Sequence, residues 1–376
     1  MQSGLTGEKG TMKVRCDRRA LQDIVGLVGG ATASRGTRPI LQHVLVKAQG
    51  SDLELLATDL EVALRCRHRP LLVEEPGAVA LPAGTLTGIL REAQGETVDL
   101  STDGSVALLR CGRGQFRVSG ENAADFPEVA VGDAETFVEM PAPLFRELAE
   151  RSEFAASREL GRYAIDGILF EIEGTTIRMV STDGRRLALA EATIEVPAAT
   201  AVKEIVPLKG VTHFLRALGP GAEVVGLHLA RHRALLRCGD TILSATARDA
   251  EFPDYRGVVP GEDAGSTVLL ERDAFFSCIR QASVLAGDDA PAVNLAFSEG
   301  SLVISGRYEG RGDSRVEMAV DYVGPEVKIA FNPGFLLDFG KLNLPEKLPF
   351  AFRDAGAACV FRPAPGFVYV VMPMSL

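Results

Sequence analysis

Six segments of the chain have apolar residues at helical spacing, and they form two sets of three. The first set is RRALQDIVGLV (18–28), APLFRELAERS (142–152) and RDAFFSCIRQASVLA (272–286). The second set is PAGTLTGILREA (82–93), PLKGVTHFLRAL (207–218) and PGFLLDFGKL (333–342). Each segment of the second set begins with a proline, which suits the first turn of a helix. We therefore predict six amphipathic helices.

Short alternating segments between these helices predict strands. VDLSTDGSVALLRC (98–111) and QFRVSG (115–120) alternate apolar and polar residues, and Asp103-Gly104 is typical of a hairpin turn. Gly50, Gly174 and Gly300 each open a further strand-like segment. The order helix, strands, helix, strands predicts α+β modules in which helices cover one face of antiparallel sheets.

This pattern occurs three times, at an interval of about 125 residues. The pentapeptide LLRCG occurs at 108–112 and again at 235–239, and each copy leads to a Phe-Pro step. Thr58-Asp59 is matched by Thr182-Asp183. A third copy is fainter but stays in phase, with its glycine at Gly300 and its proline at Pro333.

The repeat predicts three domains of equal size. Boundaries are expected near Ala134 and Asp263, where Gly, Asp and Glu cluster without apolar periodicity. The predicted organisation is a disordered N-terminal extension (1–11) followed by domains at 12–134, 135–263 and 264–376. A chain of 376 residues is too long for one ordinary core, which agrees with this division.

Composition favours a cytoplasmic protein that does not contact membranes. No apolar run approaches the roughly 18 residues of a membrane span. The start of the chain, MQSGLTGEKGT, lacks the apolar centre of a signal peptide. The six cysteines are isolated in sequence, which favours buried thiols in a reducing compartment over a zinc or redox motif.

The net charge of the chain is −10 at pH 7. Tight nucleic-acid binders are usually basic, because their affinity comes from neutralising phosphates. Taken alone, the charge argues against a protein that grips DNA.

The sequence contains no set of residues that predicts an active site. His228 and His232 are four residues apart, but LHLARHRALLRCG alternates like a strand, where such positions lie about 13 Å apart. The Thr-Asp pairs are typical of turns with side-chain hydrogen bonds. Nucleotide-binding and nucleophile motifs are missing. We expect no catalytic residue, no metal site and no cofactor.

Several separated motifs carry a resemblance to a known family. They are TRPIL (37–41), LLATDLEVAL (55–64), ADFPEV (124–129), GRYAIDGILFEIEG (161–174), VSTDGRRLAL (180–189), VPLKG (206–210), EFPDYRGVVP (251–260), IAFNPGFLLD (329–338) and YVVMPMSL (369–376). With them, residues 12–376 resemble the bacterial DNA polymerase III beta subunit, the sliding clamp family. The terminal motif, combined with STDGRRLA and FPDYR, is highly specific for it.

The resemblance implies a DNA-clamp fold, with three similar domains in each chain and two chains head to tail in a ring. Geometry agrees with a dimer, because a domain of this size is a ball roughly 35 Å across. Three such balls leave a hole of only ~5 Å, whereas six leave a hole about as wide as one ball. A duplex roughly 20 Å wide passes only the larger hole. A ring linked topologically to DNA needs no tight grip, which reconciles the acidic charge with a DNA partner.

The implied function is that of a non-enzymatic processivity factor on duplex DNA, associated with the nucleoid. The implied partners are the DNA polymerase III alpha subunit, the clamp loader, and other polymerases and repair proteins that dock short apolar peptides. Two rival hypotheses are a scaffold of three β-rich binding modules unrelated to nucleic acid, and a hydrolase with an unrecognised site.

DNA contacts are expected from inward-facing basic residues. The predicted helices carry Arg18, Arg19, Arg91, Arg146, Arg151, Lys209, Arg216, Arg280 and Lys341. An ordinary solvated helix face explains any one of these equally well, since acids such as Asp23, Glu92 and Glu147 are interspersed. The resemblance adds Arg35, Arg158 and Tyr163. The expected set is Arg35, Arg91, Arg158, Tyr163, Lys209 and Arg216.

The resemblance also implies a partner pocket between the second and third domains. The matching positions are Ile165, Thr182, Gly184, Arg186, Leu187, Pro253, Val258, Asn332, Phe335, Val370, Val371, Met372, Pro373, Met374 and Leu376. An apolar tail such as VVMPMSL suits a site for varied peptides, although it could also be the last core strand. Arg185, Gly257, Ala290 and Ser375 depart from residues frequent in the family, so the peptide preference is expected to differ.

The ring seam is expected to join the first domain to the third domain of the other chain. Charge complementarity suggests Arg110, Arg113 and Arg117 on one side and Glu309, Asp313 and Glu317 on the other. Val284 and Leu285 are expected to add apolar contact.

Overall fold

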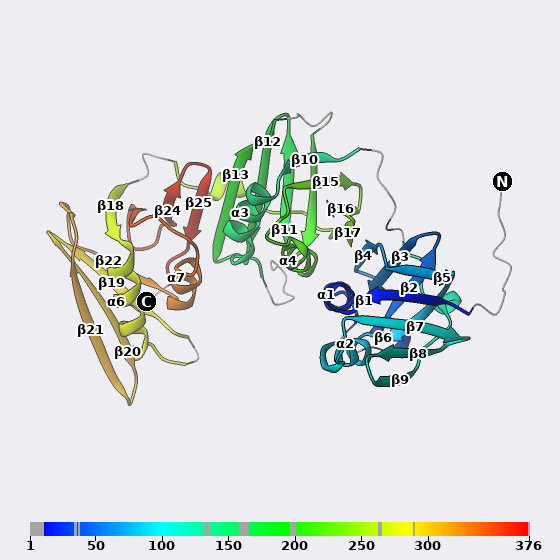
Figure 1. Ribbon diagram of the computed structural model, residues 1–376. Coiled ribbons are helices and arrows are strands. Elements are labelled where there is room, and N and C mark those ends of the chain that lie inside the picture. The colour runs from blue at the N-terminus through cyan, green and yellow to red at the C-terminus, as the bar shows by residue number, and fades with distance from the viewer. Residues whose placement is uncertain are drawn as a thin grey trace. The chain divides into compact units, whose positions relative to one another are not determined.

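The computed structural model describes residues 11–33, 36, 38–129, 131, 136–157, 165–195, 201–261, 265–288 and 290–374 (Figure 1). Arg35, Arg158, Tyr163, Ser375 and Leu376, together with the predicted boundaries at Ala134 and Asp263, lie outside these ranges. Within the described ranges, one order of helices and strands occurs three times.

The first copy contains one strand more than the other two, β5. Its elements are β1 (Lys13–Asp17), α1 (Arg18–Gly29), a 3-10 turn (Pro39–Gln42), β2 (His43–Gln49), β3 (Asp52–Thr58), β4 (Val62–His68), β5 (Leu72–Glu75), β6 (Gly77–Pro82), α2 (Ala83–Glu92), β7 (Thr97–Asp103), β8 (Val106–Cys111) and β9 (Gly114–Ser119). A second 3-10 turn, Ala123–Asp125, follows.

The second copy has the elements β10 (Val138–Pro141), α3 (Ala142–Glu153), β11 (Gly167–Glu173), β12 (Thr176–Thr182), β13 (Arg186–Thr193), β14 (Val202–Pro207), α4 (Leu208–Ala217), β15 (Val224–Ala230), β16 (Arg233–Cys238) and β17 (Thr241–Thr246). A single helical turn, α5 (Tyr255–Val258), lies between the second and third copies.

The third copy has the elements β18 (Ser266–Glu271), α6 (Arg272–Ser283), β19 (Val293–Ser298), β20 (Ser301–Tyr308), β21 (Gly312–Ala319), β22 (Val327–Phe331), α7 (Pro333–Phe339), β23 (Lys347–Phe352), β24 (Cys359–Ala364) and β25 (Phe367–Val371).

The three copies share a hydrogen bond that ties the first helix to the far half of its own domain. Arg18 N donates to Glu96 O, Ala142 N to Glu223 O, and Arg272 N to Glu346 O, each at 2.8 Å. Since the first N–H groups of a helix have no partner within the helix, this contact satisfies one of them in each domain. The predicted threefold repeat therefore extends to an individual hydrogen bond that recurs in each copy.

All six predicted helices are confirmed, and each buries an apolar stripe. Helix α1 buries Leu21, Val25 and Val28, and α2 buries Leu86 and Leu90. These two helices pack side by side in the first domain (Figure 1). Burial of one such aliphatic side chain contributes about 1.5–3 kcal/mol, which outweighs the weak helix propensity of these short segments.

Two details of the sequence prediction were wrong. A strand, not a helix, opens each copy (β1, β10 and β18). In addition, Pro82 and Pro207 end strands directly before the helices, and only Pro333 lies in a helical first turn. Both strands lie at sheet edges. Proline has no N–H to donate, and at an edge the missing donor does not break a hydrogen bond between strands.

The described strands form four antiparallel sheets, and two of these continue from one repeat into the next. Their orders are β5-β1-β7-β8-β9, β10-β15-β16-β17-β4-β3-β2-β6, β14-β11-β12-β13-β25-β24-β23-β18 and β21-β20-β19-β22. Strand β4 of the first copy pairs with β17 of the second, and β13 of the second pairs with β25 of the third. We refer to these pairings as the first and second junctions.

The chain divides into two compact units that cut across the sequence repeats. One unit is Met1–Pro143 with Lys209–Ala247, and the other is Leu144–Leu208 with Arg248–Leu376. Each unit contains one of the eight-stranded sheets, and so one junction. The second repeat contributes strands to both units because its two sheets belong to different junctions.

Glycines at the predicted strand starts form the hairpin loops of the repeat. Gly50, Gly174 and Gly300 have φ angles of 61°, 58° and 73°, a left-handed conformation that costs other residues about 1–2 kcal/mol. Gly112, in the first LLRCG segment, has a φ of 56° and is also crowded. A Cβ atom there would lie 2.1 Å from Gln94 O, whereas one at Gly50 would meet nothing within 4 Å.

Substitutions at Gly50 and Gly112 separate the cost of backbone strain from the cost of steric overlap. Gly50→Ala should destabilise the protein by about 1–2 kcal/mol, from the positive φ alone. Gly112→Ala should cost roughly 2 kcal/mol more, because the backbone at Gln94 must move. Calorimetric melting temperatures of the two variants measure the difference. Equal melting temperatures would contradict the packing at Gly112.

Candidate functional site

The paired Thr-Asp motifs form the same turn at both junctions. At the first junction, Thr58 Oγ1 donates to Val62 O (2.9 Å), and Asp59 Oδ1 accepts from Val62 N (2.8 Å). Thr182 and Asp183 make the matching bonds at the second junction, at 2.7 and 3.0 Å. The prediction of turns closed by side-chain hydrogen bonds is confirmed.

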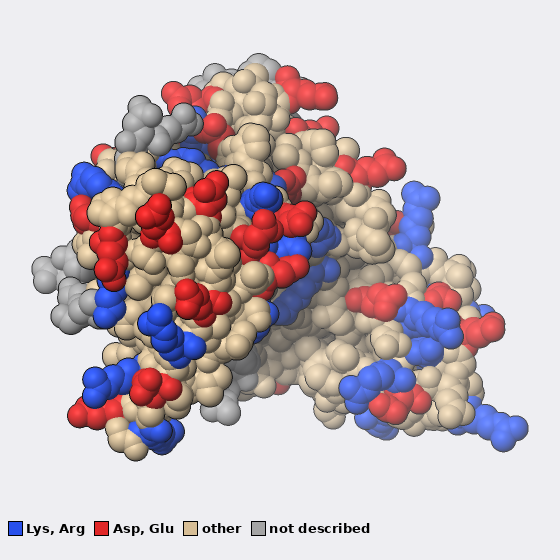
Figure 2. Space-filling view, turned by 90° about the vertical axis from the view of Figure 1, so that its left-hand side faces the viewer, with Lys and Arg blue, Asp and Glu red and all other residues tan. Residues whose placement is uncertain are grey.

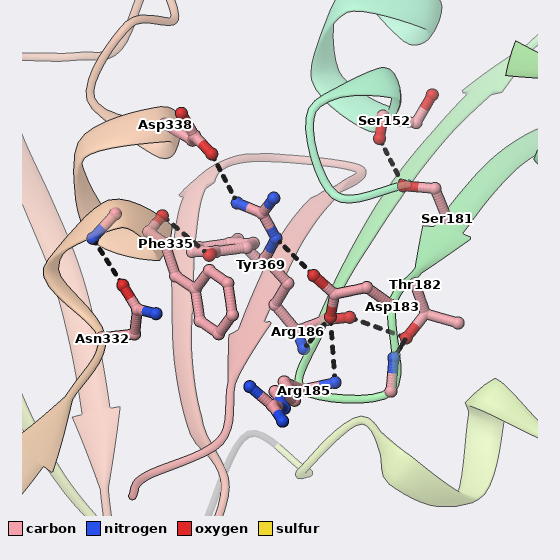
Figure 3. A network of polar contacts seen from close by, with 12 residues as sticks. Ser152, Ser181, Thr182, Asp183, Arg185, Arg186, Asn332, Phe335, Asp338 and Tyr369 are labelled. Carbon is pink, nitrogen blue, oxygen red and sulfur yellow. Dashed lines mark hydrogen bonds and ion pairs between the residues drawn. The ribbon is translucent and has the colours of Figure 1, made fainter. Parts of the chain in front are cut away.

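A cation binds the second carboxylate oxygen of each turn, and the cation differs between the junctions. Lys209, in the first turn of α4, pairs with Asp59 Oδ2. Arg186 Nε donates to Asp183 Oδ2 at 3.0 Å, and Arg186 Nη1 reaches Asp338 Oδ2 of α7 at 2.9 Å (Figure 3). Each junction is therefore closed by an ion pair between the turn of one domain and the second helix of the next.

Arg186 lies between aromatic rings and is almost fully enclosed. Its guanidinium is 4.6 Å from the centre of the Phe335 ring and 6.0 Å from that of Phe154. Tyr369 OH donates to Phe335 O at 2.9 Å, which fixes the end of α7 that carries this ring (Figure 3). Only 10% of the Arg186 side chain is exposed, and both carboxylates pair with it. From inside the site, Arg186 therefore holds the turn and α7 together.

Apolar side chains from several strands and from α5 form a cluster on one face of the sheet at the second junction. We call this the outer cluster, and its buried members are Ile165, Leu169, Val180, Leu187, Ile205, Tyr255, Val360 and Val370. The segment at 251–259 covers it with Phe252, Tyr255 and Val259. The predicted pocket residues Ile165, Leu187 and Val370 are therefore buried in this cluster, 9%, 4% and 1% exposed.

The predicted pocket also includes residues that the structure assigns to the core. Val371 is fully buried, in the core of the third domain rather than in the outer cluster. Successive residues of β25 face opposite sides of the sheet, and both sides are covered, so Val370 and Val371 are both buried. The apolar tail is thus in part the last core strand, and the exposed part begins at Met372, which is 38% exposed.

The remaining pocket positions lie at the rim of the outer cluster or beside it. Met372 N donates to Arg185 O, and Met374 N donates to Ala330 O, both at 2.8 Å, so the tail is held to the turn before β13 and to β22, on either side of Pro373. Asn332 caps α7 by accepting from Gly334 N at 2.8 Å. Val258 is 45% exposed and Pro253 is exposed, whereas Thr182 and Gly184 belong to the turn.

Of the departures from the family pattern, Arg185 and Gly257 lie on this rim. Arg185 N donates to Asp183 Oδ1 at 2.9 Å, and the residue is exposed. Gly257 lies in α5, where an added Cβ would come 3.4 Å from Asp254 Oδ2. Ala290 is exposed, and Ser375 lies outside the described residues.

Basic residues predicted to contact DNA are partly engaged within the protein. Arg91 is 67% exposed beside Glu92, and Arg216 is exposed in the last turn of α4. Lys209, in contrast, is held by Asp59. On the face shown in Figure 2, acidic and basic side chains are interspersed, so no strongly basic patch appears there.

The predicted seam residues lie on or near two sheet edges. Strand β9, with Arg117, is the edge of the five-stranded sheet, and β21, with Asp313 and Glu317, is the edge of the four-stranded sheet. Arg113 lies in the β8–β9 loop, and Glu309 in the β20–β21 loop. Arg110 lies one strand in from the edge, on β8. Val284 is 77% exposed after α6, and Leu285 is partly buried.

Within the described ranges, no three His, Cys, Asp or Glu side chains are grouped so that they could hold a metal ion. His228 lies on β15 and binds Thr136 O through Nδ1 at 2.8 Å. His232 is not on a strand, contrary to our prediction; it lies in the hairpin turn after β15 with a φ of 64°. None of the helices in the described ranges combines the length and the apolar character that crossing a membrane requires.

Three polar contacts that organise the junctions were not indicated by the sequence patterns. They are the Asp59–Lys209 pair, the Asp338 partner of Arg186, and a contact of Glu171 with Tyr255 (2.5 Å). The Thr-Asp repeat indicated that two carboxylates were placed alike. The local sequence pattern did not indicate which cation would pair with each carboxylate.

Three domains of this fold in one chain define a protein of the DNA-clamp class. Family models of the DNA polymerase III beta subunit match the chain in three parts: the N-terminal domain at residues 12–130, the central domain at 139–254 and the C-terminal domain at 256–375. The chain belongs to this family, the bacterial beta sliding clamps, which are non-catalytic processivity factors.

Individual relatives agree over nearly the whole chain. The beta sliding clamp of Pseudomonas putida is 31% identical over 97% of this chain and 100% of its own length. A solved sliding clamp of Pseudomonas aeruginosa, bound to griselimycin, is 30% identical with a TM-score of 0.91, covering 98% of this chain and 100% of that chain. The Caulobacter (C. crescentus) beta sliding clamp is 28% identical with a TM-score of 0.92, at the same coverage.

The Asp59–Lys209 pair should make the stability of the first junction depend on pH. Burial by itself would raise the pKa of Asp59, but hydrogen bonds from Lys209 and from the Val62 N–H outweigh it, so the pKa lies below its usual value. A carboxyl with a depressed pKa contributes stability above its unfolded-state pKa of about 3.9, and this contribution is lost as pH falls through the folded-state pKa.

We therefore expect Asp59→Asn to lower the melting temperature at pH 7, and the gap from wild type to close below about pH 4. Asp52→Asn is a matched control, because Asp52 is 52% exposed and faces Arg69 only at 3.9 Å. Melting temperatures measured from pH 7 to pH 3 test this. A gap that stays constant over that range would show that the charge of Asp59 contributes nothing.

Proposed function

We propose that the chain acts as a DNA sliding clamp: two copies close head to tail into a ring that encircles duplex DNA and tethers the replicative polymerase. The observation that carries the ring is that β9 and β21, both edge strands of the sheets that the structure describes, carry complementary charges. Family membership supports the same function.

The repeat itself suggests how these edges are used. At each junction, the third strand of one domain's first sheet pairs with the last strand of the next domain: β4 with β17, and β13 with β25. The equivalent strand of the third domain is β21, and the equivalent last strand of the first domain is β9. A second copy placed in the same relation would pair β21 with β9, and the contact is heterologous and ring-forming.

The register of that pairing follows from the hairpins that the repeats share. Ala63 lies opposite Ser244 at the first junction, and Leu187 opposite Val370 at the second. Counted from the same hairpin loops, the equivalent positions are Asp313 on β21 and Arg117 on β9. The same count brings Glu317 near Arg113. Opposite charges that face each other across strands contribute about 0.2–1 kcal/mol a pair.

Charged residues at these positions also suit a chain that must remain soluble before it pairs. An unpaired strand edge invites aggregation, and natural proteins blunt it with charge. Leu187 and Val370 at the second junction are apolar, as expected for a permanent contact. The proposed seam replaces them with an ion pair, which favours only the complementary edge.

The proposed passage of DNA through the closed ring accounts for the acidic composition of the chain. A closed ring is retained by topology, so weak contacts to phosphates suffice and tight ones would hinder sliding. Among the proposed DNA contacts, Arg91 and Arg216 are exposed, Lys209 would have to leave Asp59, and Arg35, Arg158 and Tyr163 remain assignments by resemblance. As a replication protein, the clamp is expected to associate with the nucleoid.

The outer cluster and its rim are proposed as the docking site for partners. An exposed methionine beside an apolar floor suits short apolar peptides of varied sequence. The proposed users are the DNA polymerase III alpha subunit, the clamp loader, and other polymerases and repair proteins. Met372 and Val258 would contact the peptide, over a floor formed by Leu187 and Val370.

Topological retention is the direct test of the proposed function. After loading onto a nicked circular duplex by the cognate clamp loader, the protein should stay with the DNA through gel filtration, and it should be released when a restriction enzyme linearises the circle. Equal loss from circular and linear DNA would refute the ring and would favour a scaffold unrelated to nucleic acid.

Charge reversal tests the seam. Arg113→Glu with Arg117→Glu should weaken dimerisation by roughly 2 kcal/mol or more, because like charges would then face each other at both seams. Adding Asp313→Arg and Glu317→Arg should restore the dimer. Arg69→Glu with Lys203→Glu changes the net charge equally, away from both edges, and should leave the dimer intact. Sedimentation velocity measures the masses, and an unchanged dimer in the first variant would contradict the seam.

A further inference from the structure

The segment at 251–259 forms one side of the proposed partner site, yet it has little structure of its own. It contains only the single turn α5 (Tyr255–Val258). Two proposed pocket residues, Pro253 and Val258, lie on it and are exposed. A turn this short is not stable by itself, so contacts from elsewhere must hold it.

Glu171 on β11 supplies such a contact. Tyr255 OH donates to Glu171 Oε2 at 2.5 Å, and Arg256 Nη2 lies 3.0 Å from both carboxylate oxygens. The Arg256 guanidinium also lies 5.4 Å from the centre of the Tyr255 ring. Glu171 is 16% exposed, and its charge is compensated by Arg256 and by Arg178, 3.7 Å away, whereas Tyr255 contributes a hydrogen bond.

The phenol of Tyr255 is placed to act as a fixed donor. Its ring is 6% exposed, packs against Phe252 at 6.4 Å between ring centres, and belongs to the outer cluster. Burial, followed by the hydrogen bond to Glu171, raises the pKa of Tyr255 to about 12. The hydroxyl therefore keeps its proton over the whole working range of pH, and the hydrogen bond to a carboxylate is of the stronger, charge-assisted kind.

The first junction is an internal comparison in which this anchor is missing. There the equivalent segment also begins with a Phe-Pro step, and Phe126 packs on a cluster with Leu56, Ala63 and Ile242. By the shared hairpins, however, the position of Glu171 is occupied by Lys47, and that of Tyr255 by Val129. The apolar cover is common to both junctions, whereas the polar anchor occurs only where the pocket is proposed.

We infer that Glu171 is a positioning residue for partner binding: acting through Tyr255 and Arg256, it holds α5 so that Pro253 and Val258 form one wall of the site. Glu171 does not touch the partner itself. Its carboxylate lies on the sheet and binds the first two residues of α5, Tyr255 and Arg256, whereas Val258 is the last residue of that turn. This inference rests on the proposed function of the outer cluster.

The experiment compares binding and local order in the full-length protein. Glu171→Ala should weaken the affinity for the cognate DNA polymerase III alpha subunit by about tenfold, the expected effect of losing hydrogen bonds to a buried charge. It should also speed amide hydrogen exchange in residues 251–259. Tyr255→Phe, which removes a single hydroxyl, should do both more weakly, and Glu171→Gln should recover part of the affinity because it keeps an acceptor for Tyr255.

Glu173→Ala is the matched control, because Glu173 lies two residues along the same strand and faces the same side, but is 65% exposed. It should change neither the affinity nor the exchange. Wild-type affinity in both Glu171→Ala and Tyr255→Phe would overturn the inference while leaving the proposed function intact. A wild-type protein that is trapped on circular DNA but does not bind the alpha subunit would overturn the docking site and this inference together.

Discussion

The pairing of strand edges between successive repeats is the constraint on which the rest of the structure depends. Backbone N–H and C=O groups at a sheet edge need partners, and the repeat meets this need by letting each domain complete the sheet of its neighbour. In such a chain the joining strand of the last domain and the last strand of the first domain are left among the sheet edges, here β21 and β9. The ring proposed for this clamp would pair these two strands through the same kind of hydrogen bonding that joins its domains.

The two junctions within the chain have the same architecture but different chemistry. Both have a Thr-Asp turn, a cation on its carboxylate and an apolar cluster covered by a Phe-Pro segment. At the first junction the cation is a lysine from the next domain, and it joins the turn to that domain through a single ion pair. At the second it is Arg186, enclosed between Phe335 and Phe154 and shared with Asp338, so that turn, helix and tail are held together around an apolar floor. Of the two equivalent surfaces, only the second has the contacts of Glu171 with Tyr255 and Arg256 that we propose to order a peptide site.

In the proposed ring, charge would serve the choice of the partner edge more than affinity for DNA. The chain is acidic overall, and its acidic and basic side chains are interspersed over the face seen in Figure 2. A ring that encircles its ligand does not depend on electrostatic attraction to stay bound, so in the proposed ring the surface charge would be available to keep β9 and β21 soluble and to select the correct partner edge. The same separation of roles leaves the apolar contacts to the junctions and the partner site.

The sequence by itself determined the local elements and their repetition. Helical spacing predicted all six long helices, glycines such as Gly174 marked the hairpins, and Thr182-Asp183 predicted its turn, because each depends on neighbours within a few residues. Resemblance to the family predicted residues for a partner site, and the structure places several of them at the second junction. Only the tertiary structure decided which strands of different domains pair, that Val370 and Val371 are buried on opposite faces of one strand, and that Arg186 and Glu171 are the charges around which the second junction is built. Those outcomes depend on contacts between residues distant in the chain, such as Arg186 with Asp338, and the periodicity of a local segment contains no information about its distant partner.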